Sequence, residues 1–440
     1  MRDYPHQLEI QPLTKPPCAS IRVPGSKSIT NRALVLAVLT TWNEETTLIG
    51  ALRSEDTELM IAALQKLGFQ VSADWDSAPP TLIVCPPSTA GGNYPPYAAD
   101  LFVGNSGTTM RFLTVLVTTG RGQFRLDGVP RMRQRPIGDL LEALSQVGVE
   151  AHSEAGNGCP PVIVNGKNFW KGDRLSVKGD VSSQFLSALM LVAPIACHED
   201  WFTIEVPEKV VSRPYIDMTA AMVRAWELPM FPDGTGFKTH HAGAHGYSCG
   251  VDVYRIEPDA SAASYFYGVS AITGGSVTVP DLPSDSIQGD IRFVDLLEQM
   301  GCKVERKHTE ITVHGGPLRG IDVDMNDISD TVMTLAAVAC FAEGPTTIRN
   351  VAHIRHKETD RIAALAVELR RLGVKVEERA DGLTITPAPL RGALVQTYND
   401  HRMAMSLALV GLKIPGVIID NPACVAKTYP RFFEDLVLLR

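Results

Sequence analysis

Apolar runs of about a dozen residues recur along the chain, and each begins beside a small polar residue. Nearly every position in these runs is apolar, rather than one face only, so we expect helices that are buried on most sides. Successive runs start 69 to 79 residues apart and together account for nearly the whole chain, which predicts six copies of one structural unit. The six starts are Ser28, Gly107, Ser182, Ala260, Ser329 and Asn399.

A short segment with alternating β-branched and apolar positions follows each run and predicts a strand. The six segments are TTLIGAL, GQFRLDG, DWFTIEVP, GGSVTVPDL, GPTTIRNV and PGVIIDNP. In five units a more charged, amphipathic segment comes next and predicts a second, outer helix. Each outer helix is expected to begin near an acid that suits an N-cap or a first turn. These acids are Asp56, Asp139, Asp217, Asp290 and Asp360.

The ends of the outer helices are marked by residues that suit a left-handed turn. Four of them are followed by a glycine, the residue that most often ends a helix in this way. The third outer helix has Glu227 at that point and is expected to end differently. The sixth unit lacks an outer helix, and we expect the run from Leu8 to Leu13 to give it a missing strand. The four glycines are Gly68, Gly148, Gly301 and Gly373.

The six units predict an α/β protein with two groups of three repeats. The break between the groups is placed near Tyr254–Pro258, with a matching crossover near Val23–Pro24. We therefore expect one continuous domain over residues 24–256. The second domain is discontinuous and combines residues 1–23 with residues 257–440.

Composition narrows the class of protein further. The 440 residues are 45% hydrophobic and 20% charged, which is typical of a globular protein of two or three domains. A net charge of −8 argues against binding nucleic acid through bulk charge. We see neither a signal peptide nor eighteen consecutive uncharged apolar residues, so no membrane span is expected. The eight cysteines never come closer than 38 residues, so we expect reduced thiols and a cytoplasmic protein.

Basic residues gather in two kinds of loop, at the N-termini of the buried helices and after the strands. Helix N-termini carry unpaired N–H groups and partial positive charge, and small residues there let an anion approach the backbone. Arginine adds bidentate recognition of carboxylate or phosphate. The pattern predicts a site for anionic ligands. The residues are Lys27, Arg32, Arg111, Arg131, Arg133, Arg135, Arg213, Arg355, Lys357, Arg361, Arg402, Lys427 and Arg431.

Acids lie among these cations, namely Asp330, Glu358, Asp360 and Asp400. A carboxylate near several cations stays ionised and can accept a proton, but a structural ion pair explains the same pattern. Asp360 is better suited to capping a helix than to catalysis. The string THHAGAHGYSCG holds His240, His241, His245 and Cys249, but it lacks the usual spacing of a metal site, and no metal is expected.

Several long motifs, in this order, resemble those of the 5-enolpyruvylshikimate-3-phosphate synthase family. They include PGSKSITNRAL, GNSGTTMRF, GDVSSQFLSAL, HKETDRI, YNDHRMAM and AKTYPRFF. The resemblance extends from about Leu8 to Phe433. It implies the two-domain enolpyruvyl transferase fold, an inside-out α/β barrel of six βαβαββ repeats with three per domain. It also implies an active site in the cleft between the two domains.

The resemblance implies transfer of the enolpyruvyl group of phosphoenolpyruvate to the 5-hydroxyl of shikimate 3-phosphate. The products are 5-enolpyruvylshikimate 3-phosphate and phosphate, formed by addition and elimination on the shikimate pathway to chorismate and the aromatic amino acids. No metal or organic cofactor is implied, since cations in a closed site stabilise the developing charge. The expected partners are these small molecules, with no nucleic acid and no membrane, and the chain is expected to be a monomer. The family is the target of glyphosate.

Site residues also follow from the resemblance. Asp330 would take the proton of the attacking hydroxyl, and Glu358, assisted by Lys27, would handle the proton at the phosphoenolpyruvate methylene. The residues implied to bind shikimate 3-phosphate are Lys27, Ser28, Arg32, Ser182, Ser183, Gln184, Ser212, Asp330, His353 and Lys357. Those implied to bind phosphoenolpyruvate are Lys27, Gly107, Arg131, Gln184, Arg361, Arg402 and Lys427.

Some positions depart from the family pattern. Ser106, Thr109 and Phe112 stand where many members have Ala, Ala and Pro, beside the implied phosphoenolpyruvate loop. They bear on inhibitor sensitivity more than on activity. His353 stands where many members have Asn, so a contact with shikimate 3-phosphate is either lost or made by this histidine.

Two other readings fit less well. The sister transferase acting on UDP-N-acetylglucosamine carries a reactive Cys five residues before an Arg-Pro pair, whereas Pro130 precedes Arg135–Pro136 here. A non-catalytic anion-binding relative would be expected to have lost at least one of four functional side chains. All four are present, namely Lys27, Asp330, Glu358 and Lys427.

Overall fold

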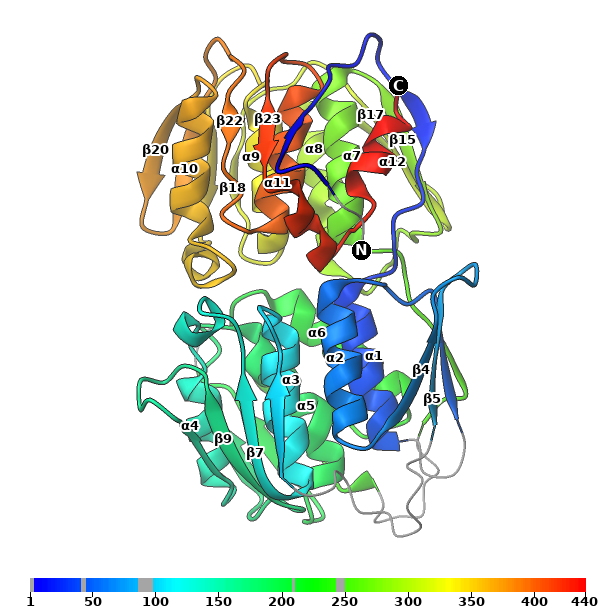
Figure 1. The fold of residues 1–440 in the computed structure, drawn as a ribbon, viewed down its shortest axis with the longest axis vertical. Coiled ribbons are helices and arrows are strands. Elements are labelled where there is room, and N and C mark those ends of the chain that lie inside the picture. The colour runs from blue at the N-terminus through cyan, green and yellow to red at the C-terminus, as the bar shows by residue number, and fades with distance from the viewer. Residues whose placement is uncertain (1–3, 41–44, 86–97, 208–209, 243–249) are drawn as a thin grey trace. The chain divides into compact units, whose positions relative to one another are not determined.

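Two compact units make up the chain. The computed structural model describes residues 4–40, 45–85, 98–207, 210–242 and 250–440. Unit 1 combines Met1–Pro24 with Glu257–Arg440, and unit 2 is Gly25–Ile256 (Figure 1). Both chain termini therefore belong to unit 1.

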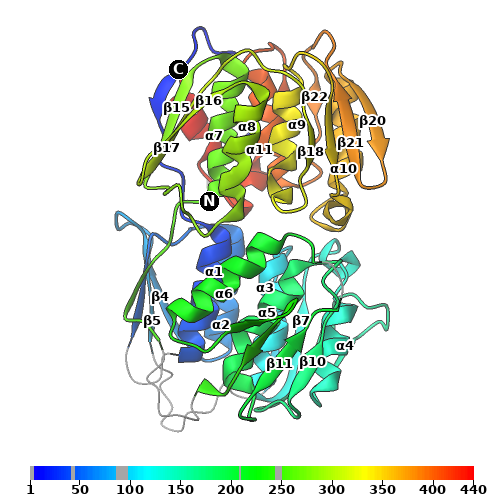
Figure 2. The same ribbon diagram turned by 180° about the vertical axis from the view of Figure 1, so that it is seen from behind.

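Unit 2 has three apolar helices at its centre. Helices α1, α3 and α5 contact one another and are almost wholly buried, as expected for runs that are apolar all round (Figure 2). Three helices with one exposed face accompany them. The central helices are α1 (Lys27–Thr40), α3 (Gly107–Leu116) and α5 (Ser183–Ala196), and the outer ones are α2 (Glu55–Lys66), α4 (Gly138–Gln146) and α6 (Arg213–Ala225).

Three four-stranded sheets belong to unit 2, and all have the same topology. In each, one parallel pair is joined to two antiparallel pairs, in the orders β14-β3-β5-β4, β6-β7-β9-β8 and β10-β11-β13-β12. The first sheet contains β3 (Thr46–Ile49), β4 (Gln70–Asp74), β5 (Thr81–Cys85) and β14 (Val253–Arg255). The second contains β6 (Ala99–Phe102), β7 (Arg121–Asp127), β8 (Glu150–Ser153) and β9 (Val162–Lys167). The third contains β10 (Arg174–Ser176), β11 (Phe202–Glu205), β12 (Phe231–Asp233) and β13 (Gly236–Thr239).

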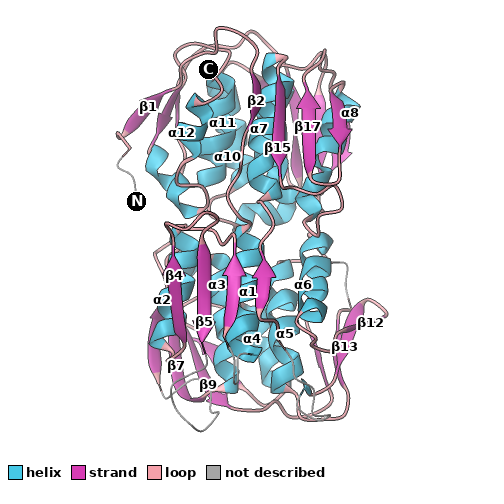
Figure 3. Ribbon diagram, turned by 90° about the vertical axis from the view of Figure 1, so that its right-hand side faces the viewer, coloured by secondary structure: helices cyan, strands magenta, loops and turns pink. Residues whose placement is uncertain are grey.

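Unit 1 repeats this plan. Its central helices α7, α9 and α11 contact one another, and sheets lie on the outside of them (Figure 3). The helices are α7 (Ala260–Thr273), α8 (Phe293–Met300), α9 (Val332–Ala339), α10 (Arg361–Arg371), α11 (His401–Gly411) and the short α12 (Phe432–Val437).

The sheets of unit 1 have the orders β16-β17-β15-β2, β18-β19-β21-β20 and β1-β23-β22. The first contains β2 (Cys18–Ser20), β15 (Ser276–Pro280), β16 (Lys303–Arg306) and β17 (Glu310–His314). The second contains β18 (Asp322–Asp324), β19 (Thr346–Arg349), β20 (Lys375–Arg379) and β21 (Gly382–Thr386). The third contains β1 (Gln7–Glu9), β22 (Leu394–Val395) and β23 (Ile418–Asp420).

Each unit completes its sheets with strands from distant parts of the chain. The N-terminal strand β1 pairs antiparallel with β23, which confirms that this end of the chain supplies a strand to the sixth repeat. The next strand, β2, pairs parallel with β15, and β14 pairs parallel with β3. All six predicted strands after the buried helices are present, as β3, β7, β11, β15, β19 and β23.

Helix ends confirm most of the predicted signals. Gly68, Gly148, Gly301 and Gly373 all have positive φ. The prediction for Glu227 is wrong, because Glu227 itself adopts φ +58° and the helix ends with the same hydrogen bond, here from Leu228 N–H to the Val223 carbonyl at 3.2 Å. Asp217 is also not at a helix start. It lies one turn inside α6 and pairs with Arg213 at 2.9 Å.

Candidate functional site

A buried cluster of charges in unit 1 surrounds Asp330. This residue lies in the turn just before α9, and its side chain is 16% exposed. Three cations donate to its carboxylate: Lys357 Nζ at 2.6 Å, Arg402 Nη2 at 2.8 Å and Arg361 Nη1 at 3.2 Å. Burial alone would raise the pKa of Asp330, but Arg402, Lys357 and Arg361 outweigh it and hold the pKa well below its ordinary value. Asp330 is therefore ionised at neutral pH.

Arg361 ties three carboxylates together. Its side chain is 1% exposed, and it donates through Nε to Asp400 at 2.8 Å, through Nη2 to Glu358 at 2.9 Å and through Nη1 to Asp330. Burial alone would lower the pKa of Arg361, but Asp400, Glu358 and Asp330 raise it above its ordinary value. The guanidinium is the common partner that holds these three acids in fixed positions.

Helix caps place the two arginines of this cluster. Asp360 caps α10 by accepting from Ala363 N–H at 3.0 Å, so Arg361 is the first residue of that helix. Asp400 caps α11 in the same way, through Arg402 N–H at 2.9 Å. Both guanidiniums thus lie at helix N-termini, where the partial positive charge of the helix adds to their own attraction for an anion.

Two lysines complete the cluster. Lys357 is next to Glu358 in sequence, and Lys427 Nζ lies 3.9 Å from Glu358 Oε1, with both side chains buried. Burial lowers the pKa of Lys357, and the neighbouring Arg361 lowers it further, while Asp330 opposes the change. We refer to Asp330, Lys357, Glu358, Arg361, Asp400, Arg402 and Lys427 as the unit 1 charge cluster.

His353 contacts Ser329, the residue next to Asp330. Its Nε2 lies 2.9 Å from the hydroxyl of Ser329, and both residues are buried. Burial, with help from Lys357, lowers the pKa of His353 to about 3. The imidazole is therefore neutral at physiological pH and acts as a hydrogen-bonding group.

The depressed pKa of His353 predicts a pH dependence of stability. Above pH 6.5 the ring is neutral in the folded and unfolded states and contributes nothing. Below that value the unfolded chain binds a proton that the folded chain does not, so the free energy of unfolding should fall by about 1.4 kcal/mol per pH unit from this group. Urea unfolding between pH 6.5 and 5 should show a shallower loss for His353→Asn than for wild type. The exposed His308→Asn control should keep the wild-type slope, and equal slopes for all three proteins would contradict the assignment.

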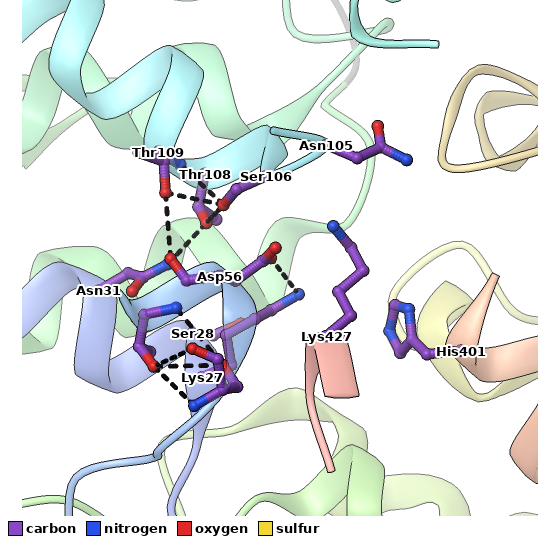
Figure 4. Close-up of polar contacts among 12 residues, drawn as sticks. Lys27, Ser28, Asn31, Asp56, Asn105, Ser106, Thr108, Thr109, His401 and Lys427 are labelled. Carbon is purple, nitrogen blue, oxygen red and sulfur yellow. Dashed lines mark hydrogen bonds and ion pairs between the residues drawn. The ribbon is translucent and has the colours of Figure 1, made fainter. Parts of the chain in front are cut away.

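In unit 2, Lys27 is the first residue of α1 and points towards an acid of the next helix (Figure 4). Its Nζ lies 3.4 Å from Oδ2 of Asp56, which is buried in the first turn of α2. In unit 1 the equivalent acid, Asp290, accepts from Ser261 near the start of α7. The same position in two repeats therefore carries a buried acid that holds the N-terminus of a central helix.

Two of the departures from the family pattern have a structural role at the start of α3. Ser106 caps this helix by accepting from Thr109 N–H at 3.4 Å, and the two hydroxyls lie 2.7 Å apart (Figure 4). Asn31 of α1 donates to Thr108 at 2.8 Å, which joins the two helix N-termini. Phe112, the third departure, is buried, and the Arg32 guanidinium carbon lies over its ring, 5.2 Å from the ring centroid.

Gly107 opens α3 at a crowded point. A Cβ built there would lie 2.5 Å from Arg135 Nη2 and 3.0 Å from Gln184 Oε1. Arg135 is buried and donates to the Asn105 carbonyl at 3.0 Å. The close approach requires glycine and brings a guanidinium and an amide beside the N–H groups that begin α3.

Arg32 is buried and makes four hydrogen bonds within unit 2. Its Nε donates to Thr219 at 2.8 Å and its Nη1 to the Ser28 carbonyl at 2.9 Å. Its Nη2 donates to Ser187 at 3.1 Å and to the Tyr215 carbonyl at 3.3 Å. Burial lowers the pKa of Arg32 to about 10, so the side chain stays charged at neutral pH.

The other predicted unit 2 residues lie at helix starts or in a turn. Ser182 caps α5 and accepts from Gln184 N–H at 3.3 Å, with Ser183 between them. Ser212 begins α6 in a left-handed conformation with φ +53°. Arg131 precedes a short 3-10 turn and donates to Gln134 at 3.3 Å.

Four charged residues that the family resemblance did not assign also belong to these clusters. The sequence placed Asp400 and Arg135 among the charged loop residues, and here Asp400 pairs with Arg361 and Arg135 lies beside Gly107. Asp56 and Asp290 were predicted only as helix starts, and their recurrence at equivalent repeat positions was the available signal. The described residues contain no group of three or more His, Cys, Asp or Glu side chains that could hold a metal ion. His245 and Cys249 lie outside the described residues.

Comparisons with known proteins agree on one family. The sequence-family model for EPSP synthase (3-phosphoshikimate 1-carboxyvinyltransferase) matches residues 14–436 of this chain. The 3-phosphoshikimate 1-carboxyvinyltransferase of Trichormus variabilis is 46% identical over 97% of both chains. The chloroplastic enzyme of Arabidopsis thaliana is 41% identical over 94% of this chain and 81% of its own.

Solved structures share the fold. EPSP synthase from Acinetobacter baumannii superposes with a TM-score of 0.77 at 24% identity, covering 98% of both chains. The enolpyruvyl transferase NikO from Streptomyces tendae gives a TM-score of 0.76 at 19% identity, covering 98% of this chain and 97% of its own. The α/β enolpyruvyl transferase fold implied by the family resemblance is therefore confirmed.

Proposed function

The chain belongs to the EPSP synthase (3-phosphoshikimate 1-carboxyvinyltransferase) family, and we propose that the side chains described above carry out the reaction of that family. The protein is a transferase that moves the enolpyruvyl group of phosphoenolpyruvate to the 5-hydroxyl of shikimate 3-phosphate and releases phosphate. The observation that carries our assignment of roles is the ionised Asp330 among Lys357, Arg361 and Arg402.

The first step is addition of the hydroxyl to phosphoenolpyruvate. Asp330 accepts the proton of the attacking 5-hydroxyl, because its carboxylate is held ionised and fixed by three cations. The hydroxyl oxygen bonds to C2 of phosphoenolpyruvate, and the methylene carbon gains a proton and becomes a methyl group. Glu358 relays this proton from the Lys27 ammonium. The adduct is tetrahedral at C2 and still carries the phosphate.

The second step is elimination. Glu358 takes a proton from the new methyl group and returns it to Lys27, the double bond forms again, and the bond between C2 and the phosphate oxygen breaks. Phosphate leaves with that oxygen and takes up the proton held by Asp330. Arg361, Arg402 and Lys427 stabilise the negative charge that develops on the departing group, as fixed charges do in a site that excludes water.

We propose that both anionic substrates bind mainly at the N-termini of helices. For shikimate 3-phosphate we propose the hydroxyls and N–H groups of the α5 and α6 starts, together with cations of α1 and the neutral His353. This set, together with Asp330, is Lys27, Ser28, Arg32, Ser182, Ser183, Gln184, Ser212, His353 and Lys357. For phosphoenolpyruvate we propose Lys27, Gly107, Arg131, Gln184, Arg361, Arg402 and Lys427.

Gly107→Ala tests the phosphoenolpyruvate assignment. The added methyl group must displace Arg135 and Gln184, which a Cβ would meet at 2.5 and 3.0 Å. We expect the KM for phosphoenolpyruvate to rise by about tenfold, with a larger rise in the inhibition constant of glyphosate. Steady-state kinetics with phosphoenolpyruvate varied at several glyphosate concentrations measures both. Gly138→Ala, at the start of α4, provides the control, since a Cβ there would lie 3.5 Å from Gly158, an ordinary van der Waals contact. Unchanged constants for Gly107→Ala would count against the assignment.

Choice of acceptor tests the function itself. Phosphate release from phosphoenolpyruvate should require shikimate 3-phosphate and should not occur with UDP-N-acetylglucosamine. The absence of the cysteine of the sister transferase supports this expectation, since Pro130 occupies that position. Release that depends on the nucleotide sugar instead would refute the proposal.

The proposal extends to the cellular compartment, the oligomeric state and the need for a cofactor. We propose a cytoplasmic enzyme that acts as a monomer on small molecules, without nucleic acid or membrane partners and without a metal or organic cofactor. The cysteines of the described residues are all free thiols, which suits a reducing compartment. Among the described helices, none is both long and apolar enough to cross a membrane.

A further inference from the structure

The stretch that leads into α11 is tied at two points to a single helix, α10. Near its start, Gln396 N–H donates to Glu368 Oε2 at 3.1 Å, and the Tyr398 hydroxyl donates to Glu368 Oε1 at 2.8 Å. At its end, Asp400 accepts from Arg361 Nε at 2.8 Å. Arg361 and Glu368 are seven residues apart on α10, about two turns, so both side chains lie on the same side of this helix.

Glu368 is unusual because its side chain is fully buried, at 0% exposure. It does not cap α10, since Asp360 does so. Both of its oxygens accept hydrogen bonds from the stretch before α11. Oε2 also accepts from Arg371 Nη1 at 3.1 Å. A buried carboxylate is costly unless its oxygens are satisfied, and here two of the partners belong to one loop.

That loop has a demanding backbone. Tyr398 and Asn399 are consecutive non-glycine residues with φ of +54° and +55°. Side chains disfavour this left-handed region, so the conformation persists only where neighbouring contacts impose it. Three contacts do so here: the Tyr398 hydroxyl donates to Glu368, the Asn399 side chain accepts from Asn421 Nδ2 at 3.2 Å, and Asp400 N–H donates to the Thr397 carbonyl at 2.9 Å across the turn.

The left-handed pair sets where α11 begins. Asp400 follows it directly and caps the helix through Arg402 N–H at 2.9 Å. Arg402 Nη2 in turn reaches Asp330 at 2.8 Å. Any other conformation at Tyr398 and Asn399 would redirect the chain just before Asp400 and move the Arg402 guanidinium away from its place beside Asp330.

We propose that Glu368 and Tyr398 are positioning residues for enolpyruvyl transfer: their hydrogen bond holds the left-handed Tyr398–Asn399 pair and thereby places Arg402. This inference rests on the proposed role of Arg402 in binding phosphoenolpyruvate. Neither residue touches a reacting atom in this account. Their effect passes through the start of α11.

Tyr398→Phe tests the proposal, because it removes one hydroxyl and leaves the ring. We expect the KM for phosphoenolpyruvate to rise by about tenfold, the loss of one hydrogen bond to a charged group, with the KM for shikimate 3-phosphate changed less than twofold. Glu368→Gln should change the same constant in the same direction. The controls are Tyr4→Phe, which loses a hydroxyl that donates to the Pro430 carbonyl, and Glu298→Gln, which loses a surface carboxylate paired with Arg306. Both should match wild type.

A double-mutant cycle separates positioning from general loosening. In an Arg402→Ala background, Tyr398→Phe should add less than a twofold further change in the KM for phosphoenolpyruvate, because its effect passes through the missing guanidinium. An unchanged KM in the single variant, or a tenfold change that persists in the Arg402→Ala background, would overturn the proposal. If Arg402→Ala itself leaves this KM unchanged, the role proposed for Arg402 in binding is what fails.

Discussion

Asp330→Asn is expected to lower the rate of the chemical step by about 10²–10⁴-fold, the usual range for removing a general base. Asparagine keeps the shape of the side chain but cannot accept the proton of the attacking hydroxyl. Binding of shikimate 3-phosphate should survive, because the serines at the helix starts of unit 2 and Lys357 are unchanged. Single-turnover kinetics on folded protein measures the chemical step without product release.

A matched control lies three residues away. Asp327 is half-exposed and pairs with Arg292 at 3.1 Å, so Asp327→Asn removes the same charge at the surface. It should leave the single-turnover rate within about twofold of wild type, since exposed ion pairs contribute little. Near-wild-type chemistry in Asp330→Asn, with stability alone reduced, would mean that Asp330 is a structural ion-pair partner and would sink its catalytic assignment.

Arg361→Ala is expected to lower the free energy of unfolding of unit 1 by about 3–5 kcal/mol, because removing one partner of a buried ion pair leaves uncompensated charge. Here the single guanidinium serves Asp330, Glu358 and Asp400. Transfer activity should also be lost, since Asp330 and Asp400 would no longer be held in place. Urea titration followed by peptide-resolved hydrogen exchange over α10 and α11 reports this unit directly.

Arg306→Ala is the comparison for that experiment. Arg306 also bridges two acids of unit 1, Asp295 and Glu298, but all three side chains are at the surface. Its removal should cost only about 0–1 kcal/mol. Equal losses for Arg361→Ala and Arg306→Ala would show that burial of the charge cluster does not determine its contribution.

The repeat could be predicted from sequence because it depends on local signals. Runs that are apolar at nearly every position became the central helices, and alternating β-branched segments became the strand that follows each of them. Gly68 and Gly373 could be identified as helix ends because few other residues tolerate positive φ. Asp360 could be identified as a cap because it stands directly before an amphipathic run.

Other features depend on contacts between distant residues and left no local signal. Arg361 and Asp400 are 39 residues apart, and the pairing exists because α10 and the start of α11 pack together. Glu227 adopts positive φ because the surrounding structure imposes it, against its own preference. Ser106 and Thr109 are departures from the family motif whose hydroxyls bond to each other, and the Ser106 hydroxyl caps α3.

For the candidate site residues, the sequence indicated the kind of ligand but not the hydrogen-bond partners of each side chain. Cations at helix starts indicated anionic ligands, and the structure places Arg361 and Arg402 in the first turns of α10 and α11. The sequence could not show that both donate to Asp330, nor that Glu368 and Tyr398 hold the loop before Asp400. Those relations come from the packing of side chains across repeats.

The fate of one oxygen atom tests enolpyruvyl transfer by addition and elimination most directly. Phosphoenolpyruvate labelled with ¹⁸O in the oxygen that joins C2 to phosphorus is incubated with the enzyme and shikimate 3-phosphate, and the products are analysed by mass spectrometry. Because the acceptor hydroxyl adds at C2 before phosphate leaves, all of the label should appear in the released phosphate and none in the enolpyruvyl product. Label retained in an organic product such as pyruvate would show cleavage at phosphorus and would contradict the account.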